Sequence, residues 1–251
     1  MPDALLATGF GELKVFSGSA HPELTREIAA FLGTQPGQAR LRRFPDTEVS
    51  FQIDENIRGT DVFVVQPTCA GAGGSVDQAL MELMIMIDAF RRSSAARITA
   101  VIPHFAYARS DKKDAPRISI GARLVADLLT TAGANRVLTM TLHSPQVHGF
   151  FSVPVDHLNA LSVLAGHFRR GDLRNTVVVS PDLGNAKQAS HFARMLGLPV
   201  AAGSKRRLGD DRVVIDAIVG DVDGKNVIVI DDEIANGGTI VGLVKRLRER
   251  R

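Results

Sequence analysis

The stretch from Val227 to Thr239 reads VIVIDDEIANGGT. Its first four residues are β-branched and apolar, which predicts a buried strand. The strand ends at two adjacent carboxylates, Asp231 and Asp232, followed by a short turn that contains glycine. A strand that ends in acidic residues and a glycine turn is the order expected of a ligand site.

The residues after this turn have the apolar spacing of a helix. Asn236 to Thr239 would therefore lie at a helix N-terminus, where backbone N–H groups and the positive end of the helix dipole favour a phosphate. Gly237 and Gly238 allow the backbone to curl around an anion. Asp231 and Asp232 could each accept from one hydroxyl of a ribose, so the segment could bind both ends of ribose 5-phosphate. The alternative is that the Asp pair only forms a solvated turn.

Length and composition set the class of protein. A chain of 251 residues suffices for one large domain or two modest ones of about 100–200 residues each. Hydrophobic residues are 45% and charged residues 23%, as in globular proteins. The net charge is only +3, and with no Trp and one Tyr the chain offers little for nucleic-acid bases to stack on. We therefore expect an anionic small substrate and no nucleic-acid partner.

Cysteine content and hydropathy predict the compartment. Cys69 is the only cysteine, so an intrachain disulfide is impossible and the reducing cytosol is favoured. No basic segment leads into a long apolar stretch near Met1, and no apolar run approaches the ~20 residues of a membrane span. We expect a soluble, cytoplasmic protein with no membrane partner.

Strand-like and helix-like segments alternate along the whole chain. Strands are expected at 13–17, 61–66, 98–103, 136–142, 176–180, 200–202, 213–219 and 227–230, and the main helices at 76–90, 119–130, 158–168 and 190–196. The alternation predicts a parallel α/β architecture in two similar halves. We expect an N-terminal domain over 1–155 and a C-terminal domain over 156–251.

Two segments of the first half could bind a nucleotide. In RFPDTEVSFQI, residues 43–53, Phe44, Asp46 and Glu48 could share one face and clamp an adenine, although a surface hairpin is the simpler interpretation. The loop HFAYARSDKKDAPR follows a strand and suits a polyphosphate, because ligands bind at the carboxyl ends of strands in open α/β sheets. The alternative is a solvated charged loop. Its candidate residues are Tyr107, Arg109, Lys112, Lys113 and Arg117.

Further candidates lie at the ends of other predicted strands. His143 follows one strand and could coordinate a metal or a phosphate oxygen, or be structural. Asp182 follows another. Lys205, Arg206 and Arg207 lie in SKRRLGDD, which we expect to be a mobile basic loop. Such a loop could close over a transferring phosphate group and stabilise charge in the transition state, or be merely solvated.

Taken in order, a series of segments resembles ribose-phosphate diphosphokinase, also called phosphoribosyl diphosphate synthetase. The segments are RFPDTEV, IRG, MELMIMIDA, IPHFAYARSDKK, TAGANRV, LHSPQVHGFF, VPVDHL, VVSPD, KRR and VIDDEIANGGT. The resemblance covers nearly the whole chain. The ribose-phosphate loop alone is shared with phosphoribosyltransferases, whereas the tandem halves, the YAR segment and the KRR segment separate the two families.

The resemblance implies two tandem phosphoribosyltransferase-like domains and transfer of the β,γ-diphosphoryl group of ATP to the anomeric hydroxyl of ribose 5-phosphate. Its products would be AMP and phosphoribosyl diphosphate, a precursor in nucleotide biosynthesis. It also implies Mg²⁺ as the cofactor. A homo-oligomer, a dimer or a hexamer, is expected because the family's ATP site is shared with a neighbouring subunit.

The resemblance also assigns residues. ATP would be bound by Phe44, Asp46, Glu48, Arg109, Lys112, Asp114 and His143, the first three reaching the adenine from a neighbouring subunit. Ribose 5-phosphate would be bound by Asp231, Asp232, Asn236, Gly237, Gly238 and Thr239, the two Asp residues acting directly or through a second Mg²⁺. His143 and Asp182 would bind the metal of Mg-ATP. Lys205 and Arg207 would be catalytic, stabilising charge on the transferring group.

Several positions depart from the family pattern. Ser110 replaces Gln after the YAR motif, Thr141 replaces Asp before the Leu-His pair, and Asn185 replaces a Gly. Ala235 and Asn236 replace Asp-Thr. The loss of two carboxylates, at positions 141 and 235, weakens the expected Mg²⁺ binding. The chain ends in KRLRERR, where the family continues, so we expect the second domain to lack its usual C-terminal part.

Three classes of function remain open from the sequence. The active synthetase is the main hypothesis. Thr141 and Ala235 would suit a catalytically weak regulatory paralogue, whereas the intact KRR segment opposes it. A plain phosphoribosyltransferase or a nucleic-acid-binding module is the third. Release of AMP from ATP in the presence of ribose 5-phosphate separates the three.

Overall fold

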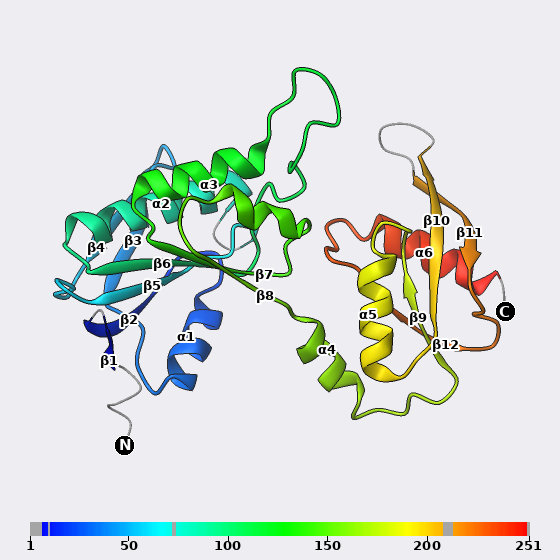
Figure 1. The fold of residues 1–251 in the computed structure, drawn as a ribbon. Helices are drawn as coiled ribbons and strands as arrows, with labels where there is room; N and C mark the ends of the chain where they lie inside the picture. Colours follow the sequence, from blue (N-terminus) through cyan, green and yellow to red (C-terminus); the bar gives the residue numbers. More distant parts are fainter. Residues whose placement is uncertain (1–6, 10, 72–73, 208–212, 250–251) are drawn as a thin grey trace. The chain divides into compact units, whose positions relative to one another are not determined.

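The computed structural model describes residues 7–9, 11–71, 74–207 and 213–249, with the side chains of 7–8, 205–207 and 213–216 outside that description. Contacts between Cα atoms divide the chain into two units, Met1–Leu158 and Asn159–Arg251. Each unit has its own sheet and its own helices (Figure 1). The predicted boundary after residue 155 falls within β8 (Val155–Leu158), the last strand of the first unit.

The first unit is built on a six-stranded sheet with the order β1-β2-β5-β6-β7-β8. The strands from β2 to β8 are all parallel, and the short β1 pairs antiparallel with β2. Their bounds are β1 Ala7–Thr8, β2 Gly11–Ser17, β5 Asp61–Val65, β6 Arg97–Ile102 and β7 Arg136–Met140. The central β5 and β6 are buried on both faces, which explains their continuous apolar sequences.

Helices cover both faces of this sheet. α2 (Val76–Arg92) and α3 (Gly121–Ala132) lie on one face, and α1 (Pro22–Phe31) lies on the other (Figure 1). A short 3₁₀ helix, η2 (Pro145–Phe150), follows β7. α2 begins with a capping box, in which the side chains of Ser75 and Gln78 each bond the other's backbone N–H. Its apolar stripe then packs on β5 and β6 in the largest core.

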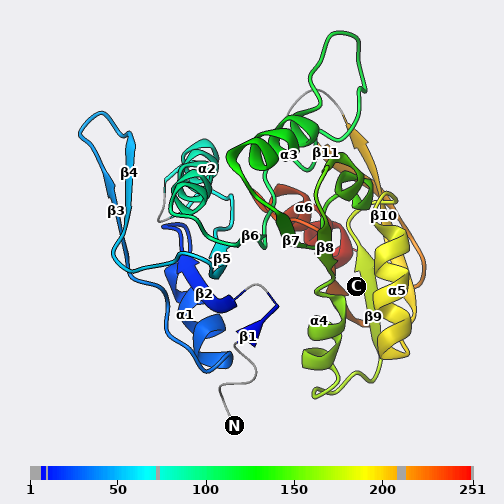
Figure 2. The same cartoon turned by 60° about the vertical axis from the view of Figure 1, so that its left-hand side comes forward.

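A separate two-stranded hairpin carries the segment that was predicted to clamp an adenine. β3 (Ala39–Arg43) and β4 (Val49–Ile53) pair antiparallel, and they lie beside α2 (Figure 2). Leu41, Phe51 and Ile53 face the core, whereas Arg40 and Arg42 are exposed. The expected surface hairpin is therefore present, and its apolar face is attached to the first unit through side chains.

The second unit contains a four-stranded sheet with the order β11-β10-β9-β12. β9 (Thr176–Ser180) pairs in parallel with both β10 (Val200–Arg207) and β12 (Asn226–Val229), and β11 (Val213–Val219) is antiparallel to β10. α4 (Leu161–Phe168) and α5 (Ala186–Leu196) pack on one face, and α6 (Gly238–Arg248) packs on the other.

The predicted α/β class with mainly parallel sheets is confirmed, and two local predictions are wrong. The helix predicted over 158–168 begins only at Leu161, as α4. Leu158 instead ends β8, which extends the first sheet. The backbone of residues 205–207 continues β10 and pairs with β11, so this basic segment is a strand where a loop was expected.

No helix within the described residues is long and apolar enough to cross a membrane.

Phe90 provides a test of how the hairpin is attached. Its ring is fully buried and contacts the rings of Phe16 and Phe51, with centroids 4.8 and 5.4 Å apart. We expect Phe90→Ala to lower the free energy of unfolding of the first unit by about 3–5 kcal/mol, because it leaves a cavity between β2, which carries Phe16, and β4, which carries Phe51. Urea unfolding can be followed by the fluorescence of Tyr107, the only Tyr in a chain without Trp.

The matched control is Phe31→Ala, because the Phe31 side chain is 91% exposed. This variant should stay within about 0.5 kcal/mol of the wild type. Equal unfolding midpoints for the two variants would contradict the described packing.

Candidate functional site

The loops that follow the parallel strands of the first unit all leave from one edge of its sheet. Gln66 is the first residue after β5, the loop of residues 103–120 follows β6, and the turn that contains His143 follows β7. This edge is where open α/β sheets bind ligands. Arg109, Lys112 and Asp114 are exposed in the 103–120 loop, with Lys112 Nζ 3.6 Å from a carboxylate oxygen of Asp114.

The base of the 103–120 loop is held by hydrogen bonds. The Thr68 hydroxyl donates to the carbonyl of His104 over 2.8 Å and accepts from the N–H of Ala106 over 2.7 Å. Ser110, one of the departures from the family pattern, accepts from the N–H of Gly121 over 2.9 Å through its hydroxyl. The loop therefore begins and ends at fixed points, and its cationic middle extends away from the sheet (Figure 1).

Tyr107 has an unusual backbone at the start of this loop. Its φ is 62°, in the left-handed region that non-glycine residues rarely adopt. Its hydroxyl donates to the carboxylate of Asp77 in the first turn of α2, and this bond raises the pKa of Tyr107. The contact attaches the YAR segment to α2 two residues before Arg109.

The predicted adenine clamp occupies the tip of the β3–β4 hairpin. The Phe44 side chain is 54% exposed, and Asp46 and Glu48 are exposed beside it. The N–H of Phe44 donates to the carbonyl of Glu48, and the N–H of Thr47 donates to the carbonyl of Phe44, both over 2.8 Å. The Asp46 carboxylate accepts from the N–H of Glu48 over 3.2 Å. The tip is thus a closed loop that presents one aromatic ring and two carboxylates.

His143 lies in the turn after β7 and is exposed. Thr141, which departs from the family pattern, has a φ of 46°, and its N–H donates to the carbonyl of Leu158 over 2.9 Å. The next N–H, of Leu142, donates to Nε2 of His157 over 3.0 Å. Burial, together with the nearby His148, lowers the pKa of His157. A neutral His157 therefore orders the turn that carries His143.

Two neighbouring strands of the second unit end in carboxylates. Because β9 and β12 are parallel and adjacent, Asp182 after β9 and Asp231 after β12 emerge at the same edge. Asn185 connects them: its N–H donates to Asp182 over 3.1 Å, and its side-chain amide donates to Asp231 over 3.4 Å. The departure from Gly to Asn thus places a hydrogen-bond donor between the two acidic tips.

The Asp231 carboxyl of this edge has a raised pKa. Burial, the adjacent carboxyl of Asp232 and the charge of Asp182 raise the pKa of Asp231 to about 6, although the N–H of Asp232 opposes the shift by donating over 3.0 Å. Acidic groups crowded in this way favour the binding of a hydroxyl donor or a cation.

The predicted phosphate loop precedes α6, which begins at Gly238. Gly237 is the N-cap residue with a φ of 70°, its carbonyl accepts from the N–H of Val241 over 2.9 Å, and no side chain caps the helix. Asn236 and Gly238 are exposed, and Thr239 is partly buried. The first turn therefore presents backbone N–H groups at the positive end of the helix dipole.

Some predicted residues cannot be compared with the structure. The side chains of Lys205 and Arg207 lie outside the described residues, and only their backbone is placed, in β10. His143 and Asp182 were predicted to share a metal, but they belong to different units, each of which is described by itself. Among the described residues, no group of three or more His, Cys, Asp or Glu side chains is arranged to hold a metal.

Asn185 and His157 lie beside predicted site residues and were missed as functional candidates. The signal for Asn185 was its departure from a glycine. Nothing local distinguishes His157, because its role depends on the register between β7 and β8.

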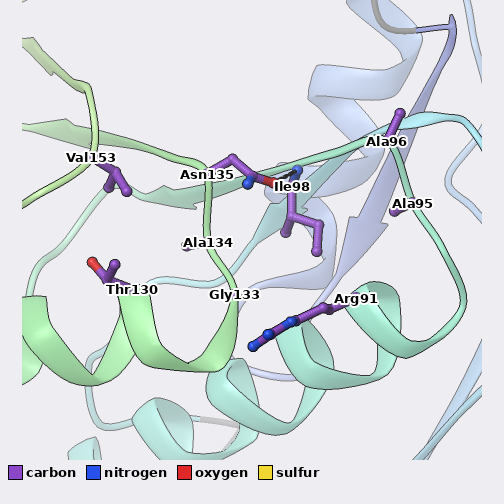
Figure 3. A pocket seen from close by; sticks show the side chains of 9 residues that line it. All are labelled: Arg91, Ala95, Ala96, Ile98, Thr130, Gly133, Ala134, Asn135 and Val153. Carbon is purple, nitrogen blue, oxygen red and sulfur yellow. Dashed lines mark hydrogen bonds between the residues drawn. The ribbon is translucent and has the colours of Figure 1, made fainter.

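A pocket of about 410 Å³ opens at the opposite edge of the first sheet (Figure 3). It is lined by Ile98 and Asn135, near the amino ends of β6 and β7, and by Arg91 of α2. The Asn135 side chain accepts from the N–H of Ile98 over 2.8 Å, so its amide oxygen already has a partner within the fold. None of the site residues predicted in the described part of the first unit lines this pocket.

Comparisons with known proteins point to one family. Residues 13–133 match the family described as the N-terminal domain of ribose phosphate pyrophosphokinase. The chain is 60% identical over 238 residues to a putative ribose-phosphate pyrophosphokinase of Streptomyces coelicolor, covering 95% of this chain and 74% of that protein. It is 51% identical to the ribose-phosphate pyrophosphokinase of Deinococcus radiodurans, covering 94% and 73%.

A solved structure gives the same result. The crystal structure of phosphoribosylpyrophosphate synthetase from Mycobacterium smegmatis superposes with a TM-score of 0.84 at 44% identity. The match covers 95% of this chain and 77% of that one. The likeness therefore extends over both units of this chain.

The hydrogen bond between Leu142 and His157 predicts a dependence of stability on pH. Because the pKa of His157 is lowered in the folded state, the unfolded chain takes up its proton first as the pH falls below about 6.5. The contribution of His157 to stability is present above that pH and is lost as the pH falls through the folded pKa.

We expect His157→Gln, whose side-chain amide reaches the position of Nε2 and can still accept from Leu142, to lose less stability than the wild type between about pH 7.5 and pH 5. Urea midpoints from Tyr107 fluorescence measure this difference. Parallel pH profiles for the two proteins would contradict the described role of His157.

Proposed function

The chain belongs to the ribose-phosphate pyrophosphokinase family, and we propose that its first unit binds ATP while its second unit binds ribose 5-phosphate. The reaction transfers the diphosphoryl group of ATP to the anomeric hydroxyl of the sugar, giving phosphoribosyl diphosphate and AMP. The observation that carries the division of roles is the segment Asp231–Thr239, in which crowded carboxylates precede an uncapped helix N-terminus.

The ribose 5-phosphate site is proposed at the tips of β9 and β12. The N–H groups at the start of α6, with Asn236 and Thr239 beside them, would bind the 5-phosphate. Asp231 and Asp232 would accept hydrogen bonds from the ribose hydroxyls. A hydroxyl that donates to Asp231 would stabilise the ionised carboxylate and so oppose the causes that raise its pKa. We therefore propose that the site binds the sugar through its diol.

The ATP site is proposed at the carboxyl edge of the first sheet. Arg109 and Lys112 would contact the phosphates from the exposed 103–120 loop, and His143 would contact them from the turn after β7. Phe44, Asp46 and Glu48 would bind the adenine of an ATP held mainly by a neighbouring subunit, in a homo-oligomer. Phe44 is suited to this role because its ring is exposed at the tip of a closed loop.

Mg²⁺ is the proposed cofactor. Asp182, Asp231 and Asp232 would offer carboxylate oxygens, the donors that this hard cation prefers. Because the described side chains by themselves are not arranged as a metal site, the ion would enter together with the phosphates of ATP. His143, at the carboxyl edge of the first sheet, would contact the metal of Mg-ATP bound to the first unit. When bound, the ion neutralises charge on the phosphoryl oxygens. The carboxylates and Asn185 orient the sugar, and the basic residues of β10 would stabilise the transferring group.

Release of AMP tests the activity directly. The protein should release AMP only when ATP, Mg²⁺ and ribose 5-phosphate are all present. A folded protein that releases none under these conditions would contradict the proposal, whereas AMP release without the sugar would indicate a different acceptor.

Asp231→Asn tests the sugar site. We expect the KM for ribose 5-phosphate to rise about 10-fold or more, with the KM for ATP within about 2-fold, because a charge-assisted acceptor for a ribose hydroxyl is lost. The matched control is Asp221→Asn, which removes an exposed carboxylate paired with Lys225 in the same unit. A wild-type KM for ribose 5-phosphate in Asp231→Asn would exclude this residue from the sugar site.

Lys205→Ala tests the basic segment. If Lys205 stabilises charge that develops only in the transition state, its removal lowers kcat by about 10²–10³-fold and leaves ATP binding almost unchanged. Single-turnover kinetics and ATP titration separate the two effects. Near-normal turnover would show that Lys205 has no catalytic role.

A further inference from the structure

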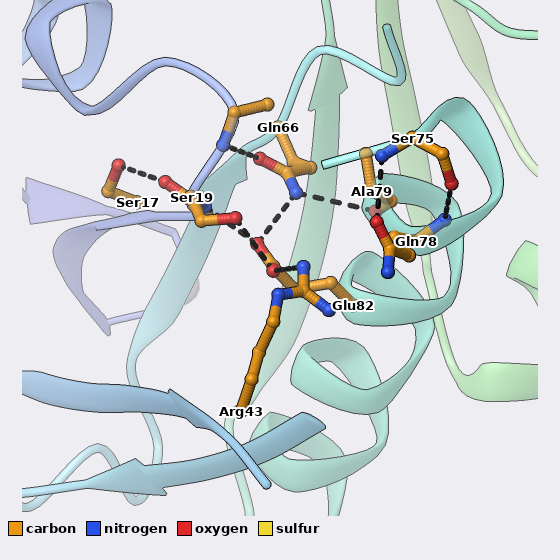
Figure 4. Close-up of polar contacts among 10 residues, drawn as sticks. Ser17, Ser19, Arg43, Gln66, Ser75, Gln78, Ala79 and Glu82 are labelled. Carbon is orange, nitrogen blue, oxygen red and sulfur yellow. Dashed lines mark hydrogen bonds and ion pairs between the residues drawn. The ribbon is translucent and has the colours of Figure 1, made fainter. Parts of the chain in front are cut away.

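The exposed hairpin tip is connected to a buried carboxylate by one residue, Arg43. We infer that Arg43, held by Glu82, positions the loop 44–48 for nucleotide binding (Figure 4). Arg43 is therefore a positioning residue, acting through the loop that carries Phe44. The inference rests on the proposed role of this loop in binding adenine.

Glu82 is an acid inside the core of the first unit. It belongs to α2, and its side chain is completely buried. One carboxylate oxygen accepts from the N–H of Ser19 over 2.6 Å and from the side-chain amide of Gln66 over 2.7 Å. The other accepts from the Ser19 hydroxyl over 2.7 Å and from the guanidinium of Arg43 over 2.8 Å. Four donors thus converge on one carboxylate.

Three of these donors fix Glu82 independently of the hairpin. Ser19 lies just beyond β2 and Gln66 just beyond β5, at the carboxyl edge of the sheet. Gln66 is itself buried, and its side chain also accepts from the N–H of Ala20 over 3.0 Å and donates to the carbonyl of Ala79 over 3.3 Å. The carboxylate is therefore a fixed point, and Arg43 is the donor that the hairpin contributes.

The place of Arg43 along the hairpin decides what it controls. β3 and β4 form their own sheet and are not hydrogen-bonded to the six-stranded sheet. Phe51 attaches the middle of the hairpin through its contact with Phe90. Arg43 is paired with Val49 in the last register pair before the tip, so its ion pair is the attachment next to the loop.

The tip is closed on itself and follows directly on this end of the stem. Backbone hydrogen bonds between Phe44 and Glu48 and between Thr47 and Phe44 close the loop on itself. A shift of Arg43 therefore displaces the whole loop, including the Phe44 ring. Without the guanidinium of Arg43, Glu82 would no longer hold the stem next to the tip, whereas the apolar side chains Leu41, Phe51 and Ile53 would still attach the rest of the hairpin to the core.

Arg43→Met tests the inference in the whole chain of 251 residues, because it keeps an unbranched apolar side chain and removes the guanidinium. We expect the KM for ATP to rise about 10-fold, with kcat and the KM for ribose 5-phosphate within about 3-fold of the wild type. Hydrogen exchange of the backbone amides of residues 44–49 should accelerate about 10-fold or more. Arg43→Lys, which restores a cation, should recover part of both effects.

Arg40→Met is the matched control. Arg40 lies on the same strand and pairs with Asp54 across the hairpin, with nitrogen and oxygen 2.7 Å apart. The change in charge and side chain is the same, but the lost ion pair lies within the hairpin and far from its tip. We expect the wild-type KM for ATP in this variant.

Phe44→Ala separates the inference from the proposed function. If Phe44→Ala raises the KM for ATP while Arg43→Met leaves both that KM and amide exchange unchanged, only the positioning role is overturned. If Phe44→Ala leaves the KM for ATP unchanged, the loop does not bind adenine and both ideas fail. If Arg43→Met reduces kcat and raises both KM values together, its effect is general destabilisation and the positioning role is also overturned.

Discussion

Parallel strand pairing is the constraint on which the rest of this structure depends. In both units the hydrogen-bonded register places the carboxyl ends of neighbouring strands at one edge of the sheet. Segments far apart in the sequence are thereby gathered without any direct local signal. Asp182 and Asp231 emerge side by side for this reason, as do the 103–120 loop and the turn that carries His143.

Acidic side chains have cationic partners at the amino edge of the first sheet but acidic neighbours at the carboxyl edge of the second. At the amino edge of the first sheet, the buried Asp61 pairs with Arg97, and Arg136 holds the pKa of Asp156 below its usual range. These acids are neutralised by neighbouring strands and stabilise the register. At the carboxyl edge of the second sheet, burial and other acids raise the pKa of Asp231. Paired charges thus support the fold, whereas crowded charges identify the candidate site.

Glu82 belongs to a third class, a buried acid at the carboxyl edge that is fully provided with donors. Its partners come from two strand ends and from the hairpin. Such a group costs free energy to bury unless each oxygen is hydrogen-bonded, and here each oxygen accepts two bonds. The network connects the separate two-stranded hairpin to the carboxyl edge of the parallel sheet.

The sequence by itself determined the α/β class, most strands and helices, and the strand-end positions of Asp182, Asp231 and His143. These features follow from local hydrophobic periodicity and turn residues, which one segment carries alone. Only the tertiary structure decided that residues 205–207 extend β10, that His157 supports the turn before His143, and that Arg43 reaches Glu82. Each of these depends on a partner from another strand or helix, and local sequence contains no information on pairing between distant segments.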